Sequence, residues 1–225
     1  MNISRFTAGD PAVEITRTGP GLWQALDDGR VAGRGEVTTR PDGRVFLTVD
    51  AWHRSVFDRL AETVLADLPG PLHTVVDGAD QELVAVWHDV GFTLGRREWD
   101  YVLPTSPEPA LPPAGVTLRP ADELARQDCA YPASGVVAVE GGESVGEIRV
   151  IRVRVDRIDL VSVLPAHRRR GIARALVAHA LGVLHRAGAE RAYAYVDEAD
   201  AAATALFEGF GDRTTSTLEL VRDGR

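Results

Sequence analysis

The stretch Val163-Leu-Pro-Ala-His-Arg-Arg-Arg-Gly-Ile-Ala173 joins an apolar run to a long amphipathic segment. The run that leads into it, Arg157–Val163, is typical of a buried β-strand. The segment that follows, Gly171–Ala187, is expected to form a helix with one apolar face. The residues of that face are Ile172, Leu176, Val177, Ala180, Leu181 and Leu184. The quoted stretch is therefore the loop of a strand–loop–helix junction.

Such a junction favours a bound anion, because the first amides of a helix have no internal partner and the helix dipole adds positive charge. Gly171 lets the backbone approach a ligand with no Cβ in the way, and Ala173 is nearly as permissive. Arg168, Arg169 and Arg170 supply cations for phosphate oxygens. The alternative is a solvated basic cluster, but the dipole disfavours cations at a helix start, so a bound anion explains the cluster better.

The rest of the C-terminal half follows from periodicity and turn residues. The expected strands are Val116–Arg119, Gly135–Val139, Gly146–Val155, Arg191–Val196 and Thr215–Val221. The further expected helices are Ala121–Asp128 and Ala201–Phe210. Gly188 is expected to end the long helix, and Asp200 to cap the last one. This order of elements predicts an α/β fold with a central mixed sheet flanked by helices.

The two halves of the chain resemble each other. Ala25–Gly33 aligns with Ala138–Gly146 at an offset of 113, and His73–Asp80 aligns with Tyr193–Asp200 at an offset of 120. The later copy has therefore gained seven residues, in the region that contains the arginine-rich loop. Between the copies lies Pro104–Pro113, whose five prolines predict an extended linker. We expect one domain over residues 1–103, a linker over 104–113 and a second domain over 114–225.

Two motifs resemble those of the GCN5-related N-acetyltransferase (GNAT) family. Arg168-Arg-Arg-Gly-Ile-Ala173 is similar to the family's acetyl-CoA signature, Arg/Gln-x-x-Gly-x-Gly/Ala. Asp200-Ala-Ala-Ala-Thr-Ala-Leu-Phe207, followed by Gly211, is similar to its Asn-x-x-Ala-x-x-Leu-Tyr…Gly-Phe segment. The resemblance covers residues 116–221, and residues 20–103 look like a degenerate second copy. It implies two tandem acetyltransferase-like domains, of which the first lacks the diphosphate-binding loop.

The resemblance also implies that acetyl-CoA is the co-substrate and that its acetyl group passes to a primary amine. The pantetheine arm would bond to the backbone of Val161 and Val163, in a gap between their strand and Arg191–Val196. The diphosphate would rest on the amides of Arg169 to Ala173. The expected cofactor-binding residues are Val161, Ser162, Val163, Arg168, Arg169, Arg170, Gly171, Ile172, Ala173, Arg174, Asp200, Ala203 and Phe207.

Asp159 is the candidate base for the acceptor amine. It is the only acid in Ile158–Val163, and it lies two and four residues before Val161 and Val163, so we expect it to share their strand face. The alternative is a structural ion pair with Arg157 or with an arginine on a neighbouring strand.

The proton for the leaving thiolate has a less obvious source. The family places a tyrosine, its presumed acid, where this chain has Phe207. Tyr195 is the candidate replacement, and Tyr193, water or unassisted departure of the thiolate are the alternatives. In the first copy, Trp52 and Trp87 are expected to fill the space that CoA takes in the second.

Composition and charge indicate the cellular compartment and the kinds of binding partner. The chain has 225 residues, a net charge of −8 and one cysteine, Cys129, which predicts a reducing cytoplasm and no disulfide or metal cluster. No apolar run is long enough to span a membrane, no signal-peptide layout is present, and the acidic balance makes nucleic acid an unfavourable partner. The expected acceptor is a small-molecule or peptide amine, and the same charge favours a cationic one. We expect an open acceptor cleft that is completed either by the N-terminal half or by another chain, with a homodimer as the candidate assembly.

Two other functions stay open. A non-catalytic acyl-CoA sensor or regulatory protein would explain Phe207 and the degenerate first copy. An interaction module whose fold has outlived its ligand would explain the same features.

Overall fold

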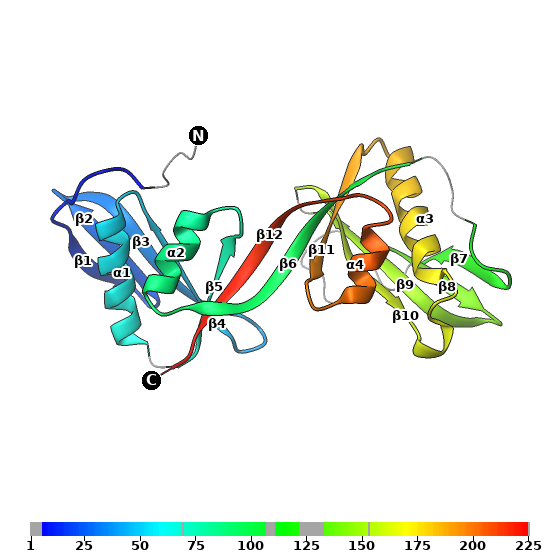
Figure 1. Ribbon diagram of the computed structural model, residues 1–225, viewed down its shortest axis with the longest axis horizontal. Helices are drawn as coiled ribbons and strands as arrows, with labels where there is room; N and C mark the ends of the chain where they lie inside the picture. Colours follow the sequence, from blue (N-terminus) through cyan, green and yellow to red (C-terminus); the bar gives the residue numbers. More distant parts are fainter. Residues whose placement is uncertain (1–5, 69, 107–110, 122–132, 153, 225) are drawn as a thin grey trace. The chain divides into compact units, whose positions relative to one another are not determined.

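The computed structural model describes residues 6–68, 70–106, 111–121, 133–152 and 154–224. They form two compact units, shown in Figure 1. Unit 1 comprises Met1–Arg97 with Ser216–Arg225, and unit 2 comprises Glu98–Thr215. None of the helices in these described ranges is long and apolar enough to cross a bilayer. The expected helix after Ala121 and the single cysteine, Cys129, lie outside the described residues.

Unit 1 is a mixed sheet with two helices. Its strands are β1 (Glu14–Gly19), β2 (Leu22–Asp27), β3 (Arg30–Thr39), β4 (Val45–Ala51), β5 (Leu72–Asp77) and the later part of β12 (Asp212–Arg222). The strand order is β1-β2-β3-β4-β5-β12, in which only the β4–β5 pair is parallel. The helices are α1 (Arg54–Asp67), which follows β4, and α2 (Gln81–Asp89), which follows β5.

Unit 2 repeats this plan. Its strands are the later part of β6 (Thr93–Pro104), β7 (Val116–Pro120), β8 (Ala133–Glu140), β9 (Glu143–Arg152), β10 (Asp156–Val163) and β11 (Arg191–Asp197). The order is β6-β11-β10-β9-β8-β7, and only β10 and β11 run parallel. A 3₁₀ turn, η2 (Pro165–His167), precedes helix α3 (Ile172–Arg186), and α4 (Ala201–Phe207) follows β11. The mixed α/β sheet predicted from the sequence is confirmed.

Two strands pass from one unit to the other. Strand β6 starts in unit 1, and its second part pairs with β11 from Glu98 to Pro104. Strand β12 starts in unit 2 and pairs with β5 from Thr217 to Arg222. Each unit thus takes its last strand from the other half of the sequence. The domain boundaries expected from the sequence, 1–103 and 114–225, do not include this exchange of strands. Sequence periodicity can identify a strand, but it does not show which sheet the strand joins.

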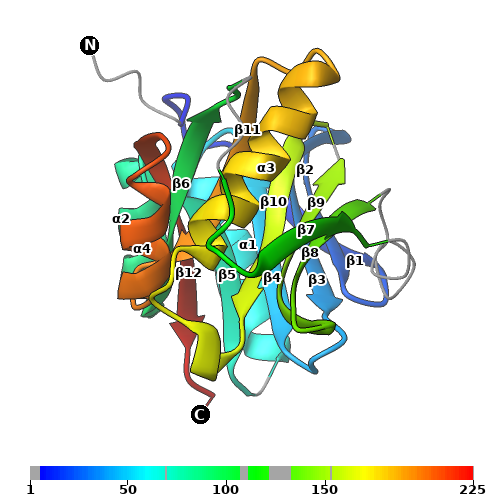
Figure 2. The same cartoon turned by 90° about the vertical axis from the view of Figure 1, so that its right-hand side faces the viewer.

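Helix α3 packs on unit 2 through the face that the sequence predicted. Its buried residues include Ile172, Leu176, Val177, Ala180, Leu181 and Leu184. They share a core with β8 to β11, across which the helix lies in Figure 2. Gly146 permits a close approach of β9 to β10, because a Cβ there would lie 2.9 Å from the carbonyl oxygen of Ser162. The helix gives way to Gly188, whose φ of +86° is the left-handed conformation expected after a helix end.

The internal repeat has a structural counterpart in the helix caps. The carboxylate of Asp80 accepts from the amide of Leu83 at the start of α2, and Asp200 accepts from the amides of Ala202 and Ala203 at the start of α4. The cap predicted at Asp200 is confirmed.

The expectation for Trp52 is wrong. Trp87 is buried against Phe57 and Phe92 in the core of unit 1, whereas Trp52 is 68% exposed. The reason is the short turn between β4 and α1, which leaves Trp52 outside the core at the surface.

A chain of residues 114–225 should not fold, because it lacks the part of β6 that completes unit 2. Tyr101 and Leu103 of β6 are 0% exposed, and removing a large buried side chain costs about 3–5 kcal/mol, comparable with the stability of a whole domain. A chain of residues 98–215 keeps both side chains and should melt cooperatively by circular dichroism. A cooperative transition in 114–225 at the same temperature would contradict this assignment.

Candidate functional site

Strands β10 and β11 separate after a short paired segment. Their parallel pairing consists of Arg157 with Tyr193 and Ile158 with Ala194. On its other edge β10 stays paired with β9 as far as Val163. The strands therefore diverge toward their carboxyl ends, as the family resemblance implies.

The backbone of β10 directs groups into this gap. The amide of Leu164 donates to the carbonyl oxygen of Val145, on the β9 side, at 2.9 Å. Alternate residues of a strand turn their backbone groups to opposite neighbours. Val161 and Val163 therefore turn theirs toward the side where β11 has moved away, which is where the pantetheine arm was expected.

The loop that follows contains two left-handed residues. Arg169 has a φ of +61° and Gly171 a φ of +87°. A left-handed conformation costs a non-glycine residue energy and often marks a functional site. A turn that contains left-handed residues can direct successive amides to one side and form an anion-binding concavity. A Cβ added at Gly171 would meet only Pro113 Cγ, at 4.0 Å, so the space beside this residue is open.

The amides from the end of the loop through the first helical turn, Arg169 to Arg174, have no acceptor within the described part of the chain. Before them, the amides of His167 and Arg168 donate to the carbonyl oxygens of Leu164 and Pro165, at 2.8 and 3.4 Å. After them, the first amide to bond internally is that of Ala175, which donates to the Gly171 carbonyl oxygen at 3.0 Å. The amides from Arg169 to Arg174 precede it, and no side chain caps the helix. Exposed donors, open space and the positive end of α3 together fit a diphosphate.

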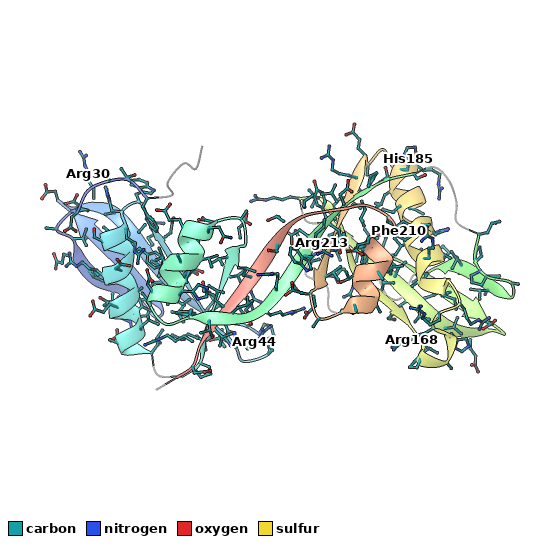
Figure 3. All side chains as sticks on the ribbon, in the orientation of Figure 1. Arg30, Arg44, Arg168, His185, Phe210 and Arg213 are labelled. Carbon is teal, nitrogen blue, oxygen red and sulfur yellow. The ribbon has the colours of Figure 1, made fainter. Side chains whose placement is uncertain are left out.

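Two of the three arginines already hold contacts within the protein. Arg168 Nε donates to the Val163 carbonyl oxygen at 3.1 Å. Arg170 donates to both carboxylate oxygens of Glu140, at 2.8 and 2.6 Å. Figure 3 shows Arg168 and His185 toward opposite ends of α3. The guanidinium carbon of Arg174 lies 5.2 Å from the ring centre of Phe210. Direct contact of all three loop arginines with phosphate remains a prediction.

Asp159 is the centre of an ion-pair cluster. Arg149 donates to its Oδ2 at 2.9 and 2.6 Å, and Arg157 donates to its Oδ1 at 3.1 Å. Both oxygens are therefore engaged by guanidinium groups. This is the structural pairing that the sequence left open as the alternative to a catalytic base.

The expectation that Asp159 shares a face with Val161 and Val163 is wrong. The register between β10 and β9 shifts between Ile158 and Leu160, so one extra residue lies in β10. Such a bulge reverses the alternation of faces beyond it. Val161 and Val163 pack against the core beneath α3, whereas the Asp159 carboxylate meets Arg149.

Tyr195 lies in the same cluster. It is 44% exposed, and its ring centre is 5.3 Å from the guanidinium carbon of Arg157, which also contacts Asp159. The structure thus brings together the two residues expected to be catalytic. Phe207 is 5% exposed and packs 6.0 Å from the ring centre of Tyr101, so it has a core position. Ala203 packs against the same core.

Sequence reasoning missed two carboxylates. Glu140 binds Arg170, thirty residues away, and no local pattern links the two positions. Glu147 Oε1 accepts from Ser162 Oγ at 3.3 Å, opposite it on the neighbouring strand. The alternation of β9 alone could have indicated that Glu147 faces away from the core, but its partner depends on the bulged register.

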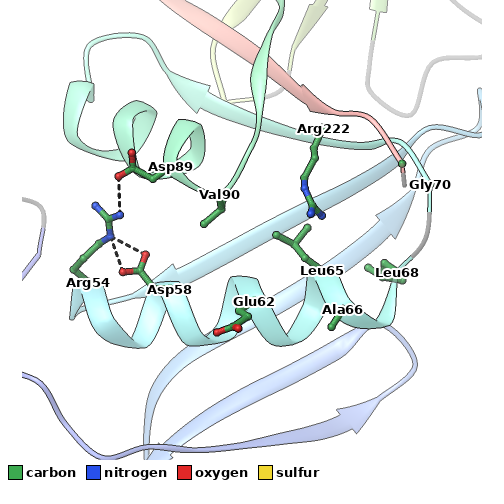
Figure 4. A pocket seen from close by; sticks show the side chains of 11 residues that line it. Arg54, Asp58, Glu62, Leu65, Ala66, Leu68, Gly70, Asp89, Val90 and Arg222 are labelled. Carbon is green, nitrogen blue, oxygen red and sulfur yellow. Dashed lines mark hydrogen bonds and ion pairs between the residues drawn. The ribbon is translucent and has the colours of Figure 1, made fainter.

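A cavity of about 750 Å³ lies within unit 1, and Figure 4 shows it between α1 and α2. The ion pairs of Arg54 with Asp58, at 2.7 Å, and with Asp89, at 2.9 Å, bridge the two helices at one side. Arg222 lies on the opposite side. All its lining residues belong to unit 1, so this cavity is separate from the loop before α3.

The comparisons with known proteins agree with this geometry. The model of the acetyltransferase (GNAT) family matches residues 98–211, half of the chain and nearly all of unit 2. The chain therefore belongs to the GNAT family, whose enzymes use acetyl-CoA as co-substrate. No curated protein sequence gives a significant match.

Solved structures share the fold over almost the whole chain. A GCN5-related N-acetyltransferase from Sphaerobacter thermophilus has a TM-score of 0.71 at 18% identity, covering 92% of this chain and 82% of that one. A GCN5-related N-acetyltransferase from Kribbella flavida has a TM-score of 0.62 at 17% identity, covering 95% and 90%. A tandem GNAT protein from the clavulanic acid biosynthesis pathway has a TM-score of 0.69 at 16% identity, covering 97% and 85%.

Gly171→Asp should abolish the binding of coenzyme A, because its carboxylate would enter the open space beside the unpaired amides. Gly171→Ala is the matched control: it carries the left-handed backbone cost of about 1–2 kcal/mol without the charge. By isothermal titration calorimetry we expect the alanine variant to bind about tenfold more weakly and the aspartate variant to show no heat of binding. Micromolar affinity in Gly171→Asp would place the diphosphate elsewhere.

Proposed function

We propose that this protein is an acetyl-CoA-dependent N-acyltransferase that transfers an acetyl group to a primary amine. The observation that carries the proposal is the row of unpaired amides from Arg169 to Arg174, at the start of α3 and beside the open space at Gly171. The divergence of β10 from β11 adds a place for the pantetheine arm next to this row. Unit 1 has no glycine between β4 and α1, and we infer that it is a degenerate copy without a diphosphate site.

Each group in unit 2 would have a distinct role in acetyl transfer. The loop amides from Arg169 onward would hold the diphosphate, and the backbone of Val161 together with the amide of Val163 would fix the arm, since the Val163 carbonyl oxygen accepts from Arg168. Bound coenzyme supplies the acetyl thioester. The backbone amide near Val163 polarises its carbonyl, as an oxyanion hole does. The acceptor nitrogen forms the new C–N bond, the C–S bond breaks, and the proton of the amine passes to a base while the thiolate leaves.

Glu147 is better placed than Asp159 to accept that proton. Guanidinium groups occupy both oxygens of Asp159, whereas within the described ranges Glu147 accepts one side-chain hydrogen bond, from the exposed hydroxyl of Ser162. Ser162 lies between Val161 and Val163, whose backbone groups face the gap. Asp159 and Tyr195 would then form one wall of the acceptor cleft, ordered by their shared contact with Arg157.

Wild-type protein should be stabilised by acetyl-CoA and should release free thiol when a suitable amine is added. A ligand at 100 times its dissociation constant stabilises a protein by about 2.7 kcal/mol, which differential scanning fluorimetry detects as a raised melting temperature. The net charge of −8 favours cationic amines, so polyamines and aminoglycosides come first in the thiol-release screen. No shift with acetyl-CoA would refute the proposal, and a shift without turnover across a broad panel would favour an acyl-CoA sensor.

Glu147→Gln should lower kcat by about 100-fold, in the range that general base catalysis contributes, with little change in acetyl-CoA affinity. Asp159→Asn should raise the KM for the amine and change kcat less, because it loosens the wall of the cleft. Steady-state kinetics with the amine varied check the assignment, because only Glu147→Gln should act mainly on kcat. The reverse order of effects on kcat would return the role of base to Asp159.

A further inference from the structure

The carboxylate of Glu140 contacts two residues of the loop that precedes α3. Glu140 lies at the end of β8, in the turn Glu140-Gly-Gly-Glu143. Both of its oxygens accept from the Arg170 guanidinium, at 2.8 and 2.6 Å. His167 Nε2 lies 3.4 Å from Oε2 of the same carboxylate. Glu140 therefore contacts residues on both sides of Arg169.

This placement is unexpected on electrostatic grounds. Glu140 reaches the loop whose exposed amides form the anion site, and like charges repel. A carboxylate there lowers the affinity for a diphosphate unless it contributes something else. Its contribution must therefore be sought in the conformation of the loop.

The loop has a conformation that needs support. Arg169 is in the left-handed region, at a φ of +61°, and it has a side chain that disfavours this region. Its neighbours are fixed by the Glu140 contacts: His167 before it and Arg170 after it. A bidentate arginine–carboxylate pair sets orientation as well as distance. The Arg170 guanidinium also holds the pKa of Glu140 below its usual value, so the pair persists at neutral and mildly acidic pH.

We propose that Glu140 is a positioning residue of the diphosphate site: through Arg170 and His167 it holds the loop so that the amides from Arg169 onward stay turned toward the ligand. The inference rests on the proposed function, because it takes coenzyme A as the ligand of this loop. It assigns Arg170 to the support of the loop and leaves Arg169 as the arginine that faces the phosphates.

Removing the Glu140 charge distinguishes a positioning role from simple repulsion of the ligand, because the two predict opposite changes in the affinity for coenzyme A. Repulsion alone predicts that Glu140→Gln binds coenzyme A more tightly, whereas positioning predicts weaker binding, by about tenfold in Kd. Glu143→Gln is the matched control, since it removes the same charge from the same exposed turn at a residue outside the loop contacts. We expect its Kd to stay within twofold of wild type.

A double-mutant cycle tests whether Glu140 acts through Arg170. Arg170→Gln should weaken binding to the same extent as Glu140→Gln, and the double variant should be no weaker than either, because both changes break one contact. Arg169→Gln should weaken binding additively with Glu140→Gln. It should also reduce the salt dependence of Kd, which a direct phosphate contact produces and loop support does not. With acetyl-CoA varied, Glu140→Gln should raise KM and leave kcat unchanged.

The measurements are isothermal titration calorimetry with coenzyme A at two salt concentrations, alongside melting temperatures that confirm each variant is folded. Equal or tighter binding in Glu140→Gln, or additive effects of Glu140→Gln and Arg170→Gln, would overturn this inference while the proposed function stands. Absence of binding by the wild-type protein would instead overturn the proposed function.

Discussion

The function proposed for unit 2 depends on main-chain donors that the described part of the protein leaves unpaired. Where β10 ends, the chain turns through two left-handed residues and enters α3, and the amides from Arg169 to Arg174 find no acceptor among the described residues. Buried or oriented donors of this kind are satisfied by water or by a ligand. The divergence of β11 leaves a gap beside β10, and the glycine at the start of α3 leaves open space beside this row of donors. The apolar face of α3 anchors the helix on the sheet and so fixes the position of its first turn.

Patterns of short range were enough to predict most of the elements. The strand before the loop, the helix after it and the cap at Asp200 each follow from residues close together in sequence. Three features could not be foreseen because they depend on register or on distant partners. The bulge between Ile158 and Leu160 turns Asp159 away from the face of Val161, and no residue in this stretch of sequence predicts a bulge. The pairing of Glu140 with Arg170 joins two turns that are thirty residues apart in the sequence. The exchange of β6 and β12 depends on which sheet each strand joins, and the sequence of a strand does not determine that.

The two units share one plan and differ mainly in the loop that precedes the first helix. Both have a parallel strand pair that parts after two residue pairs, and both have a helix after the first of these strands. In unit 1 the chain passes from β4 to α1 through Trp52 and His53, without a left-handed glycine. The fold thus produces a gap between the two parallel strands in both units. The loop before the following helix determines whether unpaired backbone donors lie beside that gap.

The exchange of β6 and β12 has a consequence for synthesis on the ribosome. Strand β5 is complete once Asp77 has left the exit tunnel, but its neighbour on one edge is Thr217–Arg222, near the end of the chain. At a translation rate of about 5–20 residues per second, that edge waits for several seconds with its main-chain groups unpaired, and such edges recruit other strands. The sheet of unit 1 therefore cannot be completed until Thr217–Arg222 has been synthesised, so the N-terminal half cannot mature ahead of the C-terminal half.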